Sequence, residues 1–341
     1  MKDNFWKKVS KKKPFFALAP MADVTDAAFR RIISKYGKPD VMWTEFVSAD
    51  GLCNAEGRKH LLIHLSFTPK ERPIVAQLFS AHPEKMREAA RLVAKLGFDG
   101  IDINMGCPDK SIEKQGAGAA LIKTPKLARE IIRAAKEGIK DAKKNIPVSV
   151  KTRVGWSKPE LETWIPELLK EDIAALTIHA RTRKELSLVP AKWEFVKRVV
   201  EIRDDFYANS KDSPRNLSED CPWNDRTLII GNGDVKDLND ARLRAKESGA
   251  DGVMIGRAIF GNPWLFSEKT TKTKEKLKVL TEHTKLFEKL FGRQKNFAIM
   301  KKHFKAYVNG FDGAKGLRVK LMVCENAREV EMIVKDFIKT L

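Results

Sequence analysis

The residues of this chain best suited to chemistry are polar or glycine residues that directly follow short apolar runs. Each has an ordinary structural explanation by itself, since a buried glutamine can satisfy backbone groups and a cysteine often packs as a small apolar side chain. Their recurrence after one apolar run after another is harder to explain as core packing. They are Pro20 and Met21, Glu45, Gln77, Asn104 and Cys107, Lys151 and Arg153, His179 and Arg181, Asn232, Gly233 and Asp234, and Gly256 and Arg257.

Two of these runs end in glycine-containing turns that suit a phosphate group. "GNGD" at 231–234 and "IGR" at 255–257 offer backbone N–H groups and an arginine, the groups that bind phosphate at βα turns. The alternative is a pair of ordinary turns. Gln77, Lys151 and His179 would line the far end of the same site, so a ligand with one phosphate and a flat polar ring fits, and flavin mononucleotide (FMN) matches this description. A lysine near the N1–C2=O edge of the ring would stabilise the anion of the reduced flavin.

The elements that must position these residues are eight apolar runs of strand length, separated by segments with a helical pattern. The runs are "FFALAP", "VMWTEFVS", "IVAQLF", "GIDINMG", "VSVKTRVG", "ALTIHAR", "TLIIGNGDV" and "GVMIGRAIF". Their continuous apolar character predicts strands buried on both faces. Eight such units predict an α/β fold, the (β/α)8 TIM barrel, in which the carboxyl ends of the strands meet at one mouth. A doubly wound open sheet would require G-x-G-x-x-G after the first strand, where this chain has "APMADVTD".

The strand pattern stops near residue 267, and helical patterns continue to the end of the chain. We therefore expect two domains: an FMN-binding catalytic barrel over residues 1–266 and a smaller, basic all-helical domain over residues 267–341. Within the barrel, the segment 204–226 is rich in Asn, Asp, Ser and Pro, which predicts a surface insertion.

The charge of the chain predicts a polyanionic partner. Its formal net charge is +20, and residues 268–341 hold 18 Lys or Arg against 9 Asp or Glu, so the helical domain should contribute to the contact. A generally lysine-rich proteome is the alternative. The stretch "KKHFKAY" places Lys301, Lys302 and Lys305 within two helical turns. With Tyr307 interleaved, this suits phosphate contacts and aromatic stacking.

The cysteines indicate a reducing compartment. Cys53, Cys107, Cys221 and Cys324 lie far apart, without a C-x-x-C pair or metal-ligand spacing, so we expect neither a disulfide framework nor a metal site. No stretch approaches the ~20 apolar residues of a membrane span. We expect a cytoplasmic protein with no membrane contact.

Taken together, the motifs of this chain resemble those of the tRNA-dihydrouridine synthases, most closely the bacterial B-type enzymes. The phosphate turns are shared by many flavin barrels, but "NMGCP" followed by "GAGAAL", and the "KKHFKAY" helix, are specific to the family. The resemblance runs in order along nearly the whole chain. Its motifs are "LAPMADVTDAAFR", "WTEFVSADGL", "QLF", "DINMGCP", "GAGAALI", "VKTRVGW", "TIHARTR", "IGNGDV", "MIGRAIFGNPWLF" and "MKKHFKAYVNGFDGAKGLR".

The resemblance implies reduction of specific uridines in tRNA to 5,6-dihydrouridine by a tightly bound FMN. NADPH would reduce the flavin transiently in a ping-pong cycle, because no fingerprint for a tightly bound nicotinamide appears. The flavin contacts it implies are Pro20, Met21 and Ala22 around the cofactor, Gln77 and Lys151 on the ring, His179 close by, and Asn232, Gly233, Asp234, Gly256 and Arg257 at the phosphate end. The substrate contacts are Asn104 on the target uracil, Arg153 and Arg181 on RNA phosphates or the base, and Lys301 and Lys302 on the tRNA body.

The same resemblance assigns Cys107 the role of general acid. Reducing the C5=C6 bond of uracil requires a hydride at C6 and a proton at C5 from the opposite face. A thiol with an ordinary pKa of ~8.5 is mostly protonated at neutral pH and can give that proton. The small residues of "GAGAA" at 116–120 would let the loop fold over a base turned out of the RNA stack. The alternative is that Cys107 only packs.

Two other functions explain part of the pattern. A flavin barrel acting on a small molecule, similar to dihydroorotate dehydrogenase, would also need a thiol or hydroxyl near the ring, but it leaves the basic helical domain unexplained. A non-catalytic RNA-binding or chaperone protein leaves Cys107, Lys151 and the phosphate turns unexplained. We expect a monomer whose partners are tRNA and NAD(P)H.

Overall fold

The centre of the molecule is one sheet of eight parallel strands, in the order β1-β8-β7-β6-β5-β4-β3-β2. The computed structural model describes residues 4–209, 226–292 and 294–341. Each predicted apolar run forms a strand, which confirms the prediction. The strands are β1 (Phe15–Leu18), β2 (Met42–Ser48), β3 (Ile74–Phe79), β4 (Gly100–Met105), β5 (Val148–Arg153), β6 (Ala175–His179), β7 (Leu228–Asn232) and β8 (Gly252–Ile255).

The sheet closes into a barrel because β1 also contacts the segment that leads into β2. The backbone N–H of Leu18 donates to the Val41 carbonyl at 3.1 Å, and Ala17 and Val41 form a parallel bridge. Closure of a parallel sheet brings the carboxyl ends of all its strands to one mouth. The predicted TIM barrel is therefore confirmed.

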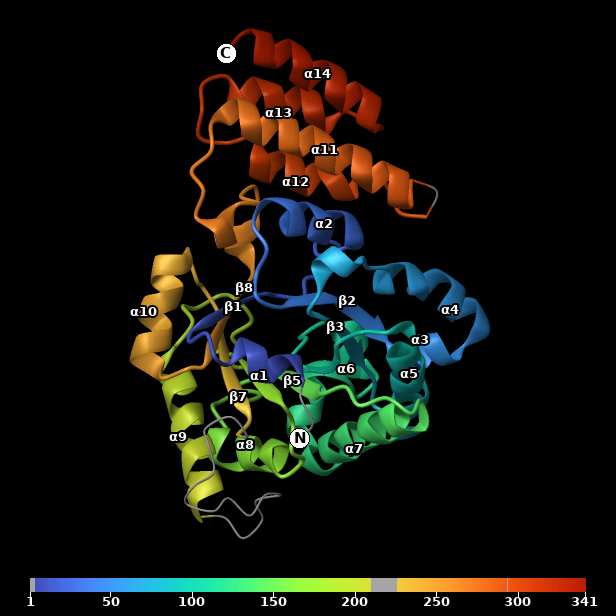
Figure 1. Ribbon diagram of the computed structural model, residues 1–341, viewed down its shortest axis with the longest axis vertical. Coiled ribbons are helices and arrows are strands. Elements are labelled where there is room, and N and C mark those ends of the chain that lie inside the picture. Colours follow the sequence, from blue (N-terminus) through green and yellow to red (C-terminus); the bar gives the residue numbers. More distant parts are fainter. Residues whose placement is uncertain (1–3, 210–225, 293) are drawn as a thin grey trace.

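Helices surround the barrel (Figure 1). Helix α5 shows how their ends are specified: it begins at Pro83 and is followed by Gly97, whose φ of 86° is the left-handed conformation that ends many helices. The helices are α2 (Ala27–Tyr36), α3 (Ala49–Cys53), α4 (Ala55–Leu61), α5 (Pro83–Leu96), α6 (Lys110–Lys114), α7 (Pro125–Asp141), α8 (Leu161–Leu169), α9 (Glu194–Asn209) and α10 (Leu238–Ser248).

Helix α1 (Phe5–Val9) covers the end of the barrel opposite the mouth. Its Trp6 side chain is buried against Phe15 and Trp43, with ring centroids 5.8 and 6.0 Å away. These residues belong to the apolar cluster that fills the barrel interior. With the bottom filled, the mouth is the end at which a ligand can reach the strand ends.

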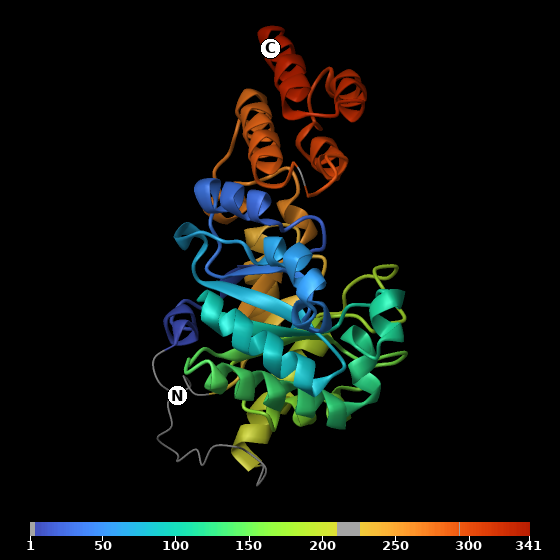
Figure 2. The ribbon, with the colours of Figure 1, turned by 90° about the vertical axis from the view of Figure 1, so that its right-hand side faces the viewer.

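The predicted helical C-terminal domain is also confirmed. Helices α11 (Thr273–Phe291), α12 (Ile299–Tyr307), α13 (Ala314–Met322) and α14 (Ala327–Lys339) follow the barrel and lie over α2 (Figures 1 and 2). Phe287 and Phe304 pack in one apolar cluster with Ile32 of α2 and with Trp264. The helical domain is thus attached to the barrel through a shared core.

The segment 204–226 differs at its start from the predicted insertion. Residues up to Asn209 belong to helix α9, because Phe206 and Tyr207 are buried against the barrel and the Tyr207 hydroxyl bonds the Thr227 hydroxyl at 3.0 Å. Residues 210–225, with Cys221, lie outside the described residues.

None of the helices within the described ranges is long and apolar enough to span a membrane.

Candidate active site at the barrel mouth

The register of the sheet places the predicted side chains next to one another at the mouth. Asn104 of β4 pairs with Lys151 of β5, and Arg153 pairs with His179 of β6. His179 in turn pairs with Asn232 of β7. Each of these pairs thus places two functional residues side by side on neighbouring strands.

A cavity of about 700 Å³ opens at this mouth. Its volume lies within the ~300–1,000 Å³ range usual for small-molecule sites. Among the sequence-predicted residues it brings together Pro20, Met21, Lys151, His179, Arg181, Asn232, Gly233, Asp234, Gly256 and Arg257.

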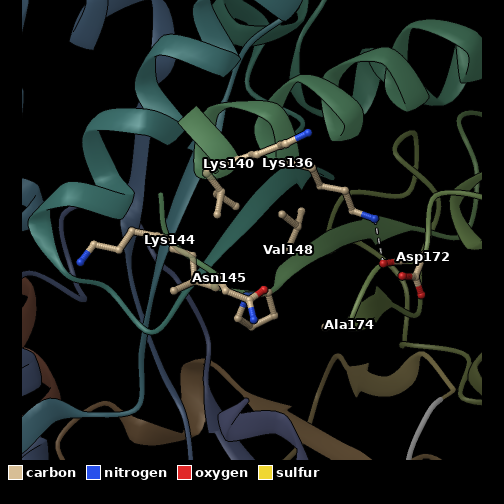
Figure 3. A pocket seen from close by; sticks show the side chains of 10 residues that line it. Lys136, Lys140, Lys144, Asn145, Val148, Asp172 and Ala174 are labelled. Carbon is tan, nitrogen blue, oxygen red and sulfur yellow. Dashed lines mark hydrogen bonds between the residues drawn. The ribbon is translucent and has the colours of Figure 1, made fainter. Parts of the chain in front are cut away.

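Another, smaller cavity of about 300 Å³ lies at the opposite end of the barrel, against the end of α7 and the start of β5 (Figure 3). Lys136, Lys140 and Lys144 contribute to its lining, and Lys136 Nζ donates to the Asp172 carbonyl at 3.0 Å. None of the predicted site residues lines it. The candidate site is therefore at the mouth.

One side of the mouth cavity is built around Asp234. Its carboxylate accepts from the Ala191 N–H at 2.8 Å and from the guanidinium groups of Arg181 and Arg257. Partial burial acts to raise the pKa of Asp234, but these hydrogen bonds lower it. The Arg257 side chain remains 68% exposed, so it can also face an anion in the cavity.

Gly233 makes room at the same end. Its φ is 131°, and an added Cβ would lie 2.7 Å from the Cβ of Ala191. A residue with a side chain would be strained there. Backbone N–H groups and an exposed arginine beside a glycine turn form a suitable cradle for a phosphate.

The opposite side of the cavity carries two half-buried basic groups, Lys151 and His179. Lys151 Nζ donates to Asn232 Oδ1 at 3.2 Å, and burial followed by the nearby Arg153 charge lowers the pKa of Lys151 to about 8. Burial and the positive charges around it, Lys151 foremost, lower the pKa of His179 well below its usual value. At neutral pH this end therefore combines a mostly charged ammonium with a neutral imidazole.

Gln77, Asn104 and Cys107 lie beside this cavity rather than in its lining, and hydrogen bonds link them. Asp102 Oδ2 accepts from Gln77 Nε2 at 2.6 Å, and Gln77 Oε1 accepts from Asn104 Nδ2 at 3.1 Å. Asn104 Oδ1 then accepts from the backbone N–H groups of Gly106 and Cys107 at 3.1 and 2.9 Å. The carboxylate of Asp102 thereby determines how both amides are oriented.

Cys107 sits in a turn that small residues support. The Ala119 N–H donates to the Cys107 carbonyl at 3.0 Å. A Cβ added to Gly118 would lie 2.8 Å from the same oxygen. The "GAGAA" segment thus packs directly against the Cys107 turn. Burial raises the pKa of the Cys107 thiol, so the thiol keeps its proton at neutral pH.

Arg153 connects the Cys107 turn to the loop after β6. Its guanidinium donates to the Gly106 carbonyl at 2.8 Å and to the Thr182 and Leu186 carbonyls at 3.1 Å. Arg153 is 6% exposed and Arg181 only 2% exposed. Both guanidinium groups are hydrogen-bonded to protein atoms in this structure. Contact of either one with RNA therefore stays a prediction.

The other predicted residues lie away from the cavity lining. Ala22 is exposed in the loop after β1, Lys301 is half-buried and Lys302 is exposed on α12. The expectation that Tyr307 interleaves with these lysines is wrong, because Tyr307 is 1% exposed within the core of the helical domain. Tyr307 is close to these lysines in the sequence, but its side chain lies on the inward face of α12.

The sequence patterns missed several residues of the site. Asp102 is fully buried, and burial raises its pKa to about 6; a carboxylate inside the apolar run "GIDINMG" was the available signal. Ser187 and Lys236 line the mouth cavity from loops whose sequence carried no such signal. No group of three or more potential metal-ligand side chains occurs in the part of the chain that the structure describes.

Comparison with known proteins adds independent information about the whole chain. The family model described as "Dihydrouridine synthase (Dus)" matches residues 17–206 and 216–341. A relative from Staphylococcus aureus (strain COL), named "Probable tRNA-dihydrouridine synthase", is 39% identical over 99% of this chain and 96% of its own. "Probable tRNA-dihydrouridine synthase 2" of Bacillus subtilis (strain 168) is 38% identical over 99% of this chain and 97% of its own.

Among solved structures, histamine dehydrogenase from Rhizobium sp. 4-9 superposes on this chain with a TM-score of 0.50 and 12% identity. The match covers 80% of this chain and 49% of that one. At this identity the similarity concerns the fold alone.

Proposed function

The chain belongs to the dihydrouridine synthase family, and from this premise we propose that it reduces specific uridines in tRNA to 5,6-dihydrouridine. The names of its full-length relatives support tRNA as the substrate. The observation that carries the proposal is the juxtaposition, at the mouth, of a cation-lined cavity and a protonated thiol: Lys151 of the cavity pairs across the sheet with Asn104, whose side chain accepts from the Cys107 N–H.

The residues at the mouth fit FMN. Arg257 and the turns at Gly233 and Gly256 would hold the phosphate end, and Lys151 and Gln77 would contact the ring, with His179 close by. The half-buried ammonium of Lys151 would offer a positive charge where the reduced ring carries negative charge. When bound, the reduced flavin supplies the hydride that reaches C6 of the uracil. NADPH is the proposed transient source of that hydride.

Cys107 would supply the proton. Its half-buried thiol stays protonated near neutral pH and can deliver that proton to C5 as the hydride arrives at C6, so the base gains one hydride and one proton. The resulting thiolate regains a proton from solvent. Asn104 and Arg153 hold the turn that carries the thiol, and Asn104 is proposed to orient the target base as well.

The exposed lysines of α12 are the proposed contact for the tRNA body. Lys302 and Lys305 are exposed, and the helical domain is linked to the barrel through a shared core. Phosphate contacts position the RNA without distinguishing its bases. The choice of base would therefore be made at the barrel mouth.

The experiment is to incubate the purified full-length chain with FMN, NADPH and an unmodified tRNA transcript and to measure dihydrouridine by nucleoside mass spectrometry. We expect dihydrouridine to accumulate at defined positions with NADPH present and not without it. NADPH oxidation by the flavin-loaded protein with no dihydrouridine in the tRNA would contradict the proposal.

A further inference from the structure

Glu45, in the middle of β2, is a buried carboxylate with hydrogen-bond partners from three different segments. It is 3% exposed. Oε1 accepts from the Asp23 N–H at 2.6 Å, and Oε2 accepts from His64 Nδ1 and Lys295 Nζ, each at 3.0 Å. A buried carboxylate is strongly unfavourable unless such partners compensate it.

Lys295 comes from the helical domain, 250 residues further along the chain. It lies in the loop between α11 and α12, and its side chain is only 8% exposed. Burial alone would raise the pKa of Glu45, but the hydrogen bond from His64 and the charge of Lys295 lower it to about 2. The carboxylate is therefore ionised, and part of its compensating charge is supplied across the domain boundary.

Asp23 belongs to the loop that forms one wall of the mouth cavity. This loop follows β1 and contributes Pro20 and Met21 to the lining. Asp23 adopts a φ of 54°, a left-handed conformation uncommon for a residue with a side chain. Its N–H is directed onto Glu45, and the Met21 N–H is bound by the Thr25 hydroxyl at 2.9 Å. Glu45 thus holds the turn of the loop next to its cavity-lining residues.

We propose that Lys295 is a positioning residue for the loop between β1 and α2, residues 19–26, here called the cofactor loop. By compensating Glu45, Lys295 lets the helical domain hold Pro20 and Met21 in place to bind the flavin. The inference goes beyond the proposed function and rests on it for the identity of the cofactor. It assigns the helical domain a second task, in addition to holding RNA.

The test measures the dissociation constant of FMN by equilibrium dialysis of the full-length chain, with no RNA present. Lys295→Met removes the only lysine partner of Glu45 among the described residues and leaves much of its charge uncompensated, with His64 as the remaining side-chain partner. Because breaking a buried ion pair is costly, we expect FMN binding to weaken by about tenfold. Adding Glu45→Gln to that variant removes the uncompensated charge and keeps an acceptor for the Asp23 N–H. The double variant should therefore bind FMN more tightly than Lys295→Met alone.

Glu282→Gln is the matched control. Glu282 of α11 accepts from Lys35 Nζ at 2.6 Å and from the Tyr36 hydroxyl at 2.5 Å, both on α2. This contact also joins the two domains, yet it does not involve the cofactor loop. We expect the control to keep its FMN affinity within about twofold, whatever it does to the melting temperature.

The outcomes separate positioning from general domain attachment. Equal FMN affinity in the wild type and Lys295→Met refutes the inference and leaves the proposed function standing. Equal weakening in Lys295→Met and Glu282→Gln also refutes it, because any loosening of the domains would then suffice. A wild-type chain that binds no FMN refutes the proposed cofactor and the inference together.

Discussion

A buried pair of histidines should make the attachment of the helical domain sensitive to acid. His283 of α11 and His303 of α12 are fully buried beside Phe29 of α2, with their own ring centroids 4.7 Å apart. Their ring nitrogens have no hydrogen-bond partner among the described residues. Burial lowers the pKa of His283 to about 3, and burial with the His283 and Lys302 charges lowers that of His303 well below its usual value.

The sign of the pH dependence follows from these shifts. Between the unfolded pKa of 6.5 and the folded value of about 3, the unfolded chain binds the proton and the folded chain does not, so stability falls as pH falls. At about pH 5 the cost for His283 is ~2 kcal/mol, since each pH unit below the unfolded pKa lowers the free energy of unfolding by ~1.4 kcal/mol. His303 adds a cost of the same sign.

The perturbation is His283→Leu, which removes the titrating ring and keeps an apolar side chain of similar size. Near pH 7.5 we expect little change in the free energy of unfolding, because no hydrogen bond is lost, and near pH 5 the variant should be more stable than the wild type by ~2 kcal/mol. Urea unfolding followed by tryptophan fluorescence measures this, because Trp264 is buried in the apolar cluster that α2 shares with the helical domain.

His60→Gln is the control, because His60 is exposed on α4 and its removal leaves the buried pair intact. The control should lose stability on acidification as the wild type does. A His283→Leu variant that loses as much stability between these pH values as the wild type would refute the reasoning.

Three further predictions concern the site and the RNA contact. Asp102→Ala leaves the Gln77 amide without its acceptor, so it should lower the free energy of unfolding by ~1–3 kcal/mol and reduce the amount of bound flavin. Asp102→Asn should change both little, because its side-chain NH2 can donate to the Ser149 hydroxyl. Thermal unfolding measures the stability, and flavin absorbance measures the bound cofactor. Arg153→Gln frees the Gly106 carbonyl and should lower kcat while flavin stays bound, and an unchanged kcat would count against the positioning role. Binding of tRNA should weaken steeply with salt, and Lys302→Gln should reduce the slope of log K against log salt by about 0.7–0.9; a flat salt response would exclude the phosphate contact.

The parts of the fold that could be predicted are those that short-range patterns determine. The eight strands are continuous apolar runs because both faces of a parallel strand are buried. The cavity residues Lys151, His179 and Arg257 could be predicted because every strand of a barrel ends at the same mouth. Gln77 and Cys107 were found by the same rule, although they lie beside the cavity and not in its lining.

The parts that could not be predicted depend on contacts between distant residues. Nothing near Lys295 in the sequence indicates that its side chain reaches Glu45. Tyr307 was assigned to the surface because helical spacing says which residues share a face and not which face is buried. Helix α9 extends into the segment taken for an insertion because Phe206 and Tyr207 find apolar partners that composition does not reveal.

The most direct test of the account is a single turnover with the flavin-loaded chain reduced beforehand and then mixed with unmodified tRNA. The wild type should form dihydrouridine, detected by nucleoside mass spectrometry. Cys107→Ala should retain its flavin but form little or no dihydrouridine, because the proton donor to C5 is missing. Dihydrouridine formed by Cys107→Ala at the wild-type rate would contradict the assignment of Cys107 as the acid.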